Sequence, residues 1–348
     1  MAETTLPSGD NSLLRDTVAE RKISWLERFL GPDNYRILVG LLKTPASILG
    51  LSLIVIFILI GVFAPLIIPA VTPNNPYMMP RDGFASQPKP MGSDWDLNAP
   101  PTVPAWVKLV TGKDQWTHIL GTSEGGYDVL YGIVWGVRTA FETGLIVVAL
   151  SFLFGVIIGA ISAYYGGVVD MVLMRIVDIF MTMPFLLAAL ILSAILTPKI
   201  GSNILGPMIA LIAFNWMNYS RIIRGDILSI KERDYVMAAR VIGVKDSQIL
   251  FKHIVPNAIF PVMILASLDI GNIVLTFAAL SFLGIGAPVG YADWGQILSF
   301  ARDWITQLGT YWYIVVWPGL ALILFVMGWN LLGDAVRDVL DPRMRGSN

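Results

Sequence analysis

The sequence predicts an all-α polytopic membrane protein with six transmembrane helices. Aliphatic and aromatic residues make up 55% of the 348 residues, charged residues make up only 14%, and the mean hydropathy is +0.67. These values lie well outside the range of soluble globular domains. The apolar residues also gather into six long segments that can cross a hydrocarbon core of about 30 Å as helices.

Composition excludes several kinds of site. The net charge of -1 gives no basic excess, so we expect no nucleic-acid partner. The chain has no cysteine, which excludes disulfides, thiolate metal sites and cysteine nucleophiles. His118 and His253 are far apart and fall on opposite sides of the predicted topology. We therefore expect no catalytic residue, no metal site and no cofactor in this chain.

The amino-terminal segment, residues 1–45, precedes the first predicted span. Its stretch from Trp25 to Leu42 mixes aromatic, aliphatic and basic residues, which is typical of an amphipathic helix at a membrane surface. A soluble capping helix is the alternative. We expect no signal peptide, because the segment is long and charged before the first apolar run. That run, residues 46–69, is the first predicted transmembrane helix and is entered through Pro45.

Residues 70–138 are rich in Pro, Asn, Gly and Trp and show no sustained period, so they predict a long external loop or a small cap. A five-helix core, residues 139–335, follows, and residues 336–348 form a carboxy-terminal tail. The predicted spans of the core are Thr139–Tyr164, Val172–Leu196, Ile204–Tyr219, Pro256–Leu283 and Tyr311–Leu332.

Small residues form a stripe on the second predicted span. Gly155, Gly159 and Ala163 recur every four residues, which lets a neighbouring helix pack closely. A substrate path along this stripe is the alternative.

Basic residues orient the chain. With the amino terminus in the cytoplasm, 17 of the 24 Lys and Arg residues lie in cytoplasmic segments and seven lie outside. Cytoplasmic loops are the ones enriched in Lys and Arg. Both termini and the charged segment Glu232–Asn257 are therefore predicted to be cytoplasmic.

The segment Glu232–Asn257 is a charged island between two apolar spans. Ser229 and Glu232 have capping-box spacing, which predicts a helix starting there. Gly243 is expected to break that helix, and Asp246 or Ser247 to cap a second one over Gln248–Ile254.

The first of these helices offers a surface to a partner. Ala238 and Ala239 leave one face nearly flat, while Val241, Ile242 and Val244 supply apolar anchors of the helix-in-groove kind. An ordinary solvated loop with helical character is the alternative.

The order of these residues resembles a known signature. Permease subunits of ATP-binding-cassette importers carry Glu-Ala-Ala, three residues, Gly, nine residues, Ile, one residue and Leu-Pro, and the chain places Met237-Ala238-Ala239, Gly243, His253 and Val255-Pro256 on that spacing. Met237 replaces the glutamate. His253 stands in the isoleucine position, as is usual in the dipeptide and oligopeptide permease family, whose C-type subunit the chain resembles from about Ala46 to Arg343.

Other stretches share this similarity. They are Tyr164–Gly167, Met174–Asp178, Leu280–Gly284, Trp294–Gly295 and Asn330–Arg343. The resemblance implies that the cytoplasmic island couples the chain to an ATPase. The residues implied in coupling are Tyr235, Met237, Ala238, Ala239, Arg240, Gly243, Val244, His253, Val255 and Pro256.

The resemblance also implies the partners. They are a homologous B-type permease subunit, two ATPase subunits and an external solute-binding protein, assembled in the lipid of a prokaryotic inner membrane. The chain has no G-x-x-x-x-G-K-[ST], so ATP and Mg²⁺ are expected on the ATPase subunits. The implied substrate is a short peptide, with oligosaccharides or nickel as alternatives. A six-span channel and an intramembrane enzyme are rivals from other classes, but neither explains the spacing in the island.

Polar residues inside the spans are candidates for the translocation path, because such groups usually face a cavity or a partner. Asp269 and Asn272 lie one turn apart in the fifth predicted span, and Asn215 and Asp178 lie in the fourth and third. An interhelical hydrogen bond is the alternative for Asp269.

Overall fold

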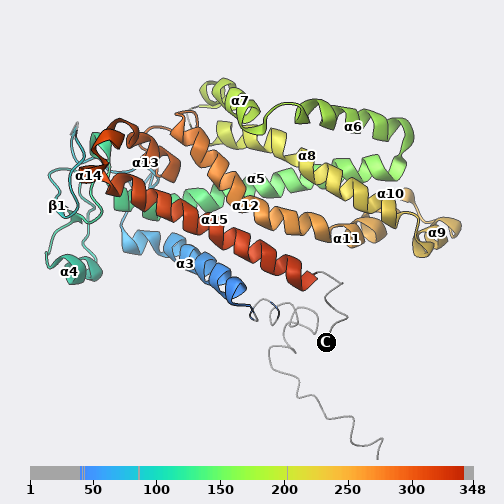
Figure 1. Cartoon of the computed structure of the whole chain (residues 1–348), viewed down its shortest axis with the longest axis horizontal. Coiled ribbons are helices and arrows are strands. Elements are labelled where there is room, and N and C mark those ends of the chain that lie inside the picture. The colour runs from blue at the N-terminus through green and yellow to red at the C-terminus, as the bar shows by residue number, and fades with distance from the viewer. Residues whose placement is uncertain (1–39, 41, 43, 85–86, 202, 341–348) are drawn as a thin grey trace, which may run out of the picture.

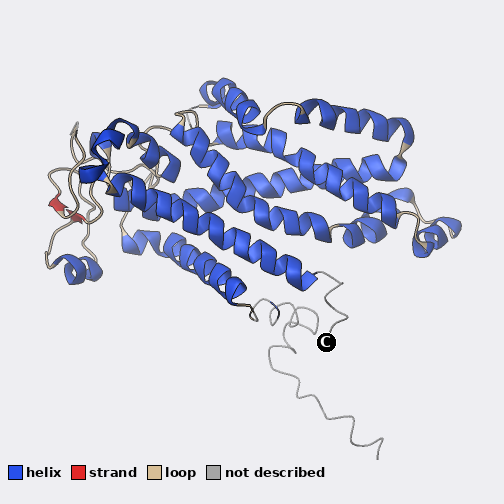
Figure 2. Ribbon diagram, viewed as in Figure 1, coloured by secondary structure: helices blue, strands red, loops and turns tan. Residues whose placement is uncertain are grey.

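The computed structural model describes residues 40, 42, 44–84, 87–201 and 203–340 and is mainly helical (Figures 1 and 2). The amphipathic helix predicted over Trp25–Leu42 lies almost entirely outside the described residues, as does the tail from residue 341 onward.

Four helices of the described residues are long and apolar enough to cross a membrane: α3 (Pro45–Ile67), α5 (Val129–Tyr165), α12 (Phe260–Phe282) and α15 (Tyr313–Leu340). A fifth span is obtained if α6 (Gly167–Met181) and α7 (Phe185–Ile200), which are bent by 87°, count as one. The helix α8 (Leu205–Ile230) is not among them. Asn215, Asn218 and Arg221 lower its mean hydropathy.

The helix bounds differ from the predicted spans at several ends: α8 continues past Tyr219 to Ile230, and α15 continues past Leu332 to Leu340, into the predicted tail. Two further differences have a local cause. The helix α5 begins ten residues before Thr139, because the Asp128 side chain accepts a hydrogen bond from the Tyr131 amide at 2.7 Å and caps it. The span predicted over Val172–Leu196 is instead an elbow between α6 and α7. Pro184 stands at this break, and proline disfavours helical geometry in the residue before it.

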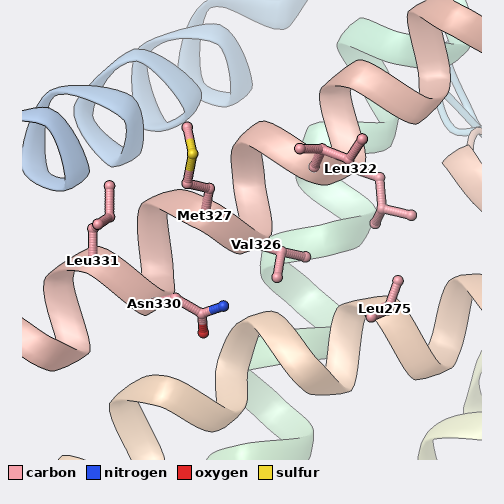
Figure 3. A pocket seen from close by; sticks show the side chains of 7 residues that line it. Leu275, Leu322, Val326, Met327, Asn330 and Leu331 are labelled. Atoms are coloured by element: carbon pink, nitrogen blue, oxygen red, sulfur yellow. The ribbon is translucent and has the colours of Figure 1, made fainter.

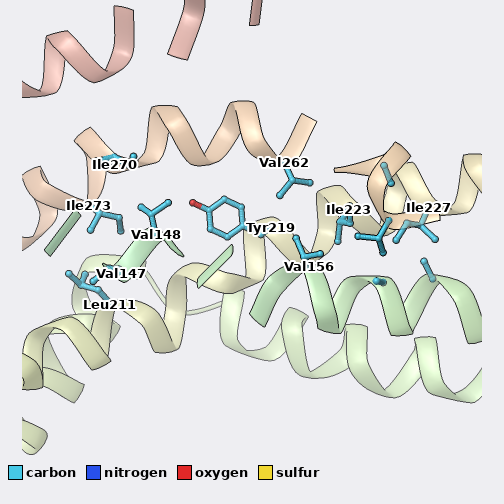
Figure 4. Packing of buried hydrophobic residues seen from close by; sticks show 14 of the residues in the cluster. Val147, Val148, Val156, Leu211, Tyr219, Ile223, Ile227, Val262, Ile270 and Ile273 are labelled. Atoms are coloured by element: carbon cyan, nitrogen blue, oxygen red, sulfur yellow. The ribbon is translucent and has the colours of Figure 1, made fainter. Parts of the chain in front are cut away.

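The bundle is built around the contact between α5 and α8. A Cβ atom at Gly155 or Gly159 would collide with the α8 backbone at Trp216 or Ser220, so the small-residue stripe packs against α8 as predicted. In Figure 1, α12 and α15 lie side by side along the bundle, and α3 lies next to α15. Figure 4 shows the apolar core between α5, α8 and α12, which includes Val148, Tyr219 and Ile270.

One end of the bundle carries a compact cap rather than an extended loop (Figure 1). The strand β1 (Ser93–Asp94) pairs antiparallel with β2 (Thr117–His118), and α4 (Ala105–Thr111) and the 3₁₀ turn η1 (Glu124–Gly126) complete the segment. Between α12 and α15, the helix α13 (Trp294–Phe300), the 3₁₀ helix η3 (Arg302–Gln307) and α14 (Leu308–Tyr311) close the same end.

Buried hydrogen bonds hold the cap to the start of α5. The His118 ring donates to or accepts from Asp128 Oδ2 at 2.7 Å and Asp82 Oδ2 at 2.9 Å, and its side chain is fully buried. Burial alone would raise the pKa of Asp82, but hydrogen bonds from Lys89, His118 and the amides of Leu97 and Asp96 outweigh it and lower the pKa to about 2.

A second buried acid lies at the start of α13. The Asp293 carboxylate accepts from the Gln296 amide at 2.9 Å and caps this helix. Burial raises the pKa of Asp293 to about 6, although hydrogen bonds from Ser281 and from the amides of Gln296 and Gly295 oppose the shift.

Candidate functional site

The charged island contains a short helix, α9 (Asp234–Val241), that starts two residues later than predicted. The preceding α8 continues through Ser229 to Ile230, so Ser229 and Glu232 do not form the predicted capping box. Arg233 takes the N-cap position without a side-chain hydrogen bond. Apolar contacts of the α8 end, where Ile227 is fully buried, explain why the helix runs on past Ser229.

The second half of the island returns the chain to the bundle. It consists of α10 (Asp246–Gln248), the π-helix η2 (Ile249–Ile254) and α11 (Val255–Ala258). Gly243 separates the two halves at φ 79°, a left-handed conformation that glycine adopts without steric cost, as predicted. Neither Asp246 nor Ser247 acts as the cap, because Lys245 takes that position.

Exposed side chains of α9 form a surface that faces away from the bundle. Val241 is 86% exposed and Ile242 is 78% exposed, and Tyr235 and Met237 are exposed as well. Of the other predicted coupling residues, Ala238, Arg240, Gly243 and Pro256 are exposed, Ala239, Val244 and His253 are half-buried, and Val255 is buried. Two large apolar side chains are thus exposed side by side at the end of α9.

The island is rigidly seated on the bundle through its other face. Val236, Ile249, Leu250 and Ile254 are buried and belong to the same apolar cluster as Ile223 and Ile227 of α8. Figure 4 shows Ile223 and Ile227 at the end of this cluster. The apolar cluster therefore connects the island to the end of α8.

A polar contact also ties the island to the end of α5. The Tyr164 hydroxyl donates to Asp246 Oδ1 at 2.6 Å, and the Arg240 guanidinium lies over the Tyr164 ring at 5.5 Å. Nearby, Lys231 Nζ donates to the Ala163 carbonyl at 3.1 Å. Sequence reasoning noted Tyr164 only as part of a similar stretch, because the contact joins residues that are 82 positions apart.

The intramembrane candidates divide into two groups. Asp269 Oδ2 accepts from Asn215 Nδ2 at 2.7 Å and from the Tyr219 hydroxyl at 2.6 Å, so α12 and α8 share one polar cluster. Tyr219 is fully buried and was not a predicted candidate. Asn272 is exposed on α12, and Asp178 of α6 forms an exposed ion pair with Arg221 of α8.

Two grooves on the bundle surface carry further amides. The first, of about 350 Å³, lies between α12 and α15, and in Figure 3 the Asn330 side chain points into it among Leu275, Val326 and Met327. The second, of about 300 Å³, lies at the elbow between α6 and α7, where Asn218 of α8 is exposed among methionine and phenylalanine side chains. Neither residue was a predicted path candidate, and the grooves that expose them are formed by residues distant in the sequence.

Comparisons with known proteins agree with one family. Residues 155–346 match the family described as binding-protein-dependent transport system inner membrane component. The dipeptide transport system permease protein DppC of Alkalihalophilus pseudofirmus is 32% identical over 87% of this chain and 88% of its own length. The oligopeptide transport system permease protein OppC of Bacillus subtilis is 33% identical over 86% of each chain. A solved inward-facing MetNI methionine ABC transporter aligns with 61% of this chain and 98% of its own, at 19% identity and a TM-score of 0.48.

Proposed function

Since the chain belongs to the binding-protein-dependent transport system inner membrane component family, we propose that it is the C-type permease subunit of an ATP-driven importer of short peptides. The names of its relatives, which are dipeptide and oligopeptide permeases, support peptides over oligosaccharides or nickel. A channel is less well supported, because a pore alone does not require the docking surface on α9.

In this proposal the chain crosses the membrane six times, with α3, α5, the α6–α7 elbow, α8, α12 and α15 as its spans. Both termini and α9 are cytoplasmic, as the 17 cytoplasmic and seven external basic residues favour. The cap over residues 70–128 then faces outward, toward the solute-binding protein. The protein lies in the inner membrane and pairs with a B-type permease subunit.

The observation that carries the proposal is the exposed apolar surface of Val241 and Ile242 on a loop that is otherwise firmly seated. We place an ATPase subunit on this surface. The ten coupling residues named above, from Tyr235 to Pro256, form or support it. ATP and Mg²⁺ bind to the two ATPase subunits, because this sequence contains no phosphate-binding loop.

Movement of the docked loop reaches the spans by two routes. The helices α8 and α12 are joined to the loop through the chain, and α5 is joined to it through the Tyr164 hydroxyl and Asp246. Closure of the two ATPases rocks these helices, and the central cavity opens outward to receive substrate. By reciprocity, docking of the loaded solute-binding protein favours the closed ATPase pair.

The translocation path uses polar groups that keep free hydrogen-bonding capacity. Asn272 meets this condition best, since it is exposed. Asp178 pairs with Arg221 through one carboxylate oxygen and keeps the other for a ligand. Asp269 and Asn215 bond to each other and are placed behind the path, where they orient α12 against α8. The exposed Asn218 at the elbow also lines the path in this proposal, because the methionine side chains around it adapt to ligands of different shape.

Reconstitution tests the function. Vesicles that contain this chain, the B-type permease and the ATPases should take up labelled dipeptide or tripeptide when the solute-binding protein and ATP are added. Unlabelled peptide should compete, whereas oligosaccharide and Ni²⁺ should not. Vesicles with this chain alone should neither hydrolyse ATP nor accumulate peptide, and accumulation there would overturn the proposal.

A further inference from the structure

The short helix α4 of the cap is bonded to the end of α3 and exposes two apolar side chains. Val107 is fully buried, and the Trp106 indole donates to the Ile67 carbonyl at 3.1 Å, which ties α4 to the last residue of α3. Within one helical turn of Trp106, Leu109 is 86% exposed and Val110 is 64% exposed. Two large apolar side chains therefore project from a helix that is held against the end of a membrane span.

Contacts of three tryptophans hold α4 in place. The Trp106 and Trp116 rings pack edge to face with centroids 6.1 Å apart, and the Trp116 indole donates to the Thr102 carbonyl at 2.8 Å. A third indole, of Trp135, donates to the Ile68 carbonyl at 3.1 Å. Three tryptophans thus gather where α3 leaves its apolar segment, and tryptophan is the residue most enriched at the boundary between lipid and water.

The end of α3 to which Trp106 is bonded also exposes apolar side chains. Toward this end of α3, Val62, Phe63 and Leu66 are exposed, with Leu66 at 69%. Lysines lie beside the apolar pair, where Lys108 pairs with Asp114 at 2.8 Å and Lys113 pairs with Asp94 at 2.5 Å. A helix that exposes apolar side chains and carries Lys108, with Lys113 just beyond its end, is suited to the headgroup region of a bilayer.

We propose that α4 is an anchor that lies in the outer surface of the membrane, with Leu109 and Val110 inserted at the boundary between headgroups and acyl chains. The partner of this surface is lipid, because Trp106 ties α4 to the last residue of α3, a membrane span whose final turns expose Val62, Phe63 and Leu66, and because tryptophans gather at this level. The inference rests on the proposed membrane placement of α3 and not on the identity of the transported solute. The anchor keeps α4 and the attached end of α3 at the level of the lipid headgroups.

Site-directed labelling tests the anchor directly, because the chain has no cysteine of its own. Leu109→Cys, labelled with a nitrobenzoxadiazole fluorophore, is placed in nanodiscs as part of the complete transporter. We expect strong quenching by lipids that carry a nitroxide near the headgroup, weaker quenching by lipids that carry it deep in the acyl chain, and little quenching by iodide from water.

The control is Phe84→Cys, labelled in the same way. Phe84 is 88% exposed, and its ring lies 4.4 Å from Arg81, whose guanidinium donates to the Gly125 carbonyl of η1. Its label should be quenched by iodide and not by the lipids. The proposal is wrong if the Leu109 label behaves like the Phe84 label, or if it becomes shielded only when the solute-binding protein is added. Peptide uptake measured in parallel reports failure of the proposed function separately.

Discussion

The polar cluster between α12 and α8 can be tested by replacing Asp269 with leucine. This change leaves the Tyr219 hydroxyl and the Asn215 amide, which donate at 2.6 Å and 2.7 Å, without their common acceptor. Hydrogen bonds between membrane helices contribute about 0.6 kcal/mol on average and up to about 1.7 kcal/mol. The loss of two such bonds should lower the free energy of unfolding by about 1–3 kcal/mol. Both donors bond to Oδ2, so Asp269→Asn, with its amide oxygen in that place, keeps their common acceptor and should lose much less stability.

The assay is SDS-induced unfolding in mixed micelles, followed by circular dichroism, with peptide uptake measured on the assembled transporter. Asn272→Leu supplies the matched control, because Asn272 lies one turn away on α12 but is exposed. The control should leave the free energy of unfolding unchanged. If Asp269→Leu is as stable as the native chain, the cluster does not orient the helices. If Asp269→Asn is stable but uptake falls, Asp269 belongs to the path instead.

Three further predictions concern other parts of the chain. Gly243→Val should uncouple ATP hydrolysis from uptake without loss of membrane insertion, because the left-handed backbone costs an ordinary L-residue roughly 1–2 kcal/mol. The control Gly243→Asn should be tolerated. Coupled uptake by the valine variant would contradict this prediction. Tyr164→Phe should lower the uptake obtained per ATP hydrolysed, since only the bond to Asp246 is removed; an unchanged ratio would exclude this contact from coupling. Thermal melting should show that native stability falls as pH rises from about 4 to about 6, because the pKa of Asp293 is raised to about 6 in the folded state. Asp293→Asn keeps the cap of α13 and should remove that fall; an equal fall in both proteins would assign it to other groups.

The sequence was most informative where local chemistry decides the structure. The first span was predicted from Ala46 to Ile68, and α3 runs from Pro45 to Ile67. Its apolar run is continuous and starts at a proline, so both ends have a local cause. Gly243 was also predicted correctly, because a bend between two short helices needs a residue that tolerates positive φ.

The sequence was least informative where a distant contact decides the structure. The start of α5 was missed because residues 129–138 are stabilised by the cap and by α3, where the Arg138 guanidinium donates to the Gly61 carbonyl at 2.6 Å. The Ser229 capping box has the right spacing, but burial of Ile227 favours continuation of α8. Hydropathy also cannot show an elbow, since α6 and α7 are apolar on both sides of their break.

The two attachments of α5 differ in a way that bears on coupling. With 37 residues, this helix is about 55 Å long and extends from the cap to the island. At its first end, Asp128 contacts the His118 ring, and both side chains are shielded from water, with exposures of 5% and 0%. At its other end, Tyr164 bonds to Asp246, which is exposed and can exchange this bond for water. Buried charge-assisted bonds are stronger than exposed ones, because solvent screens the exposed ones. The helix is therefore held firmly to the cap and reversibly to the island, so a movement of the island can tilt α5 or release it, whereas the cap must follow α5 in either case.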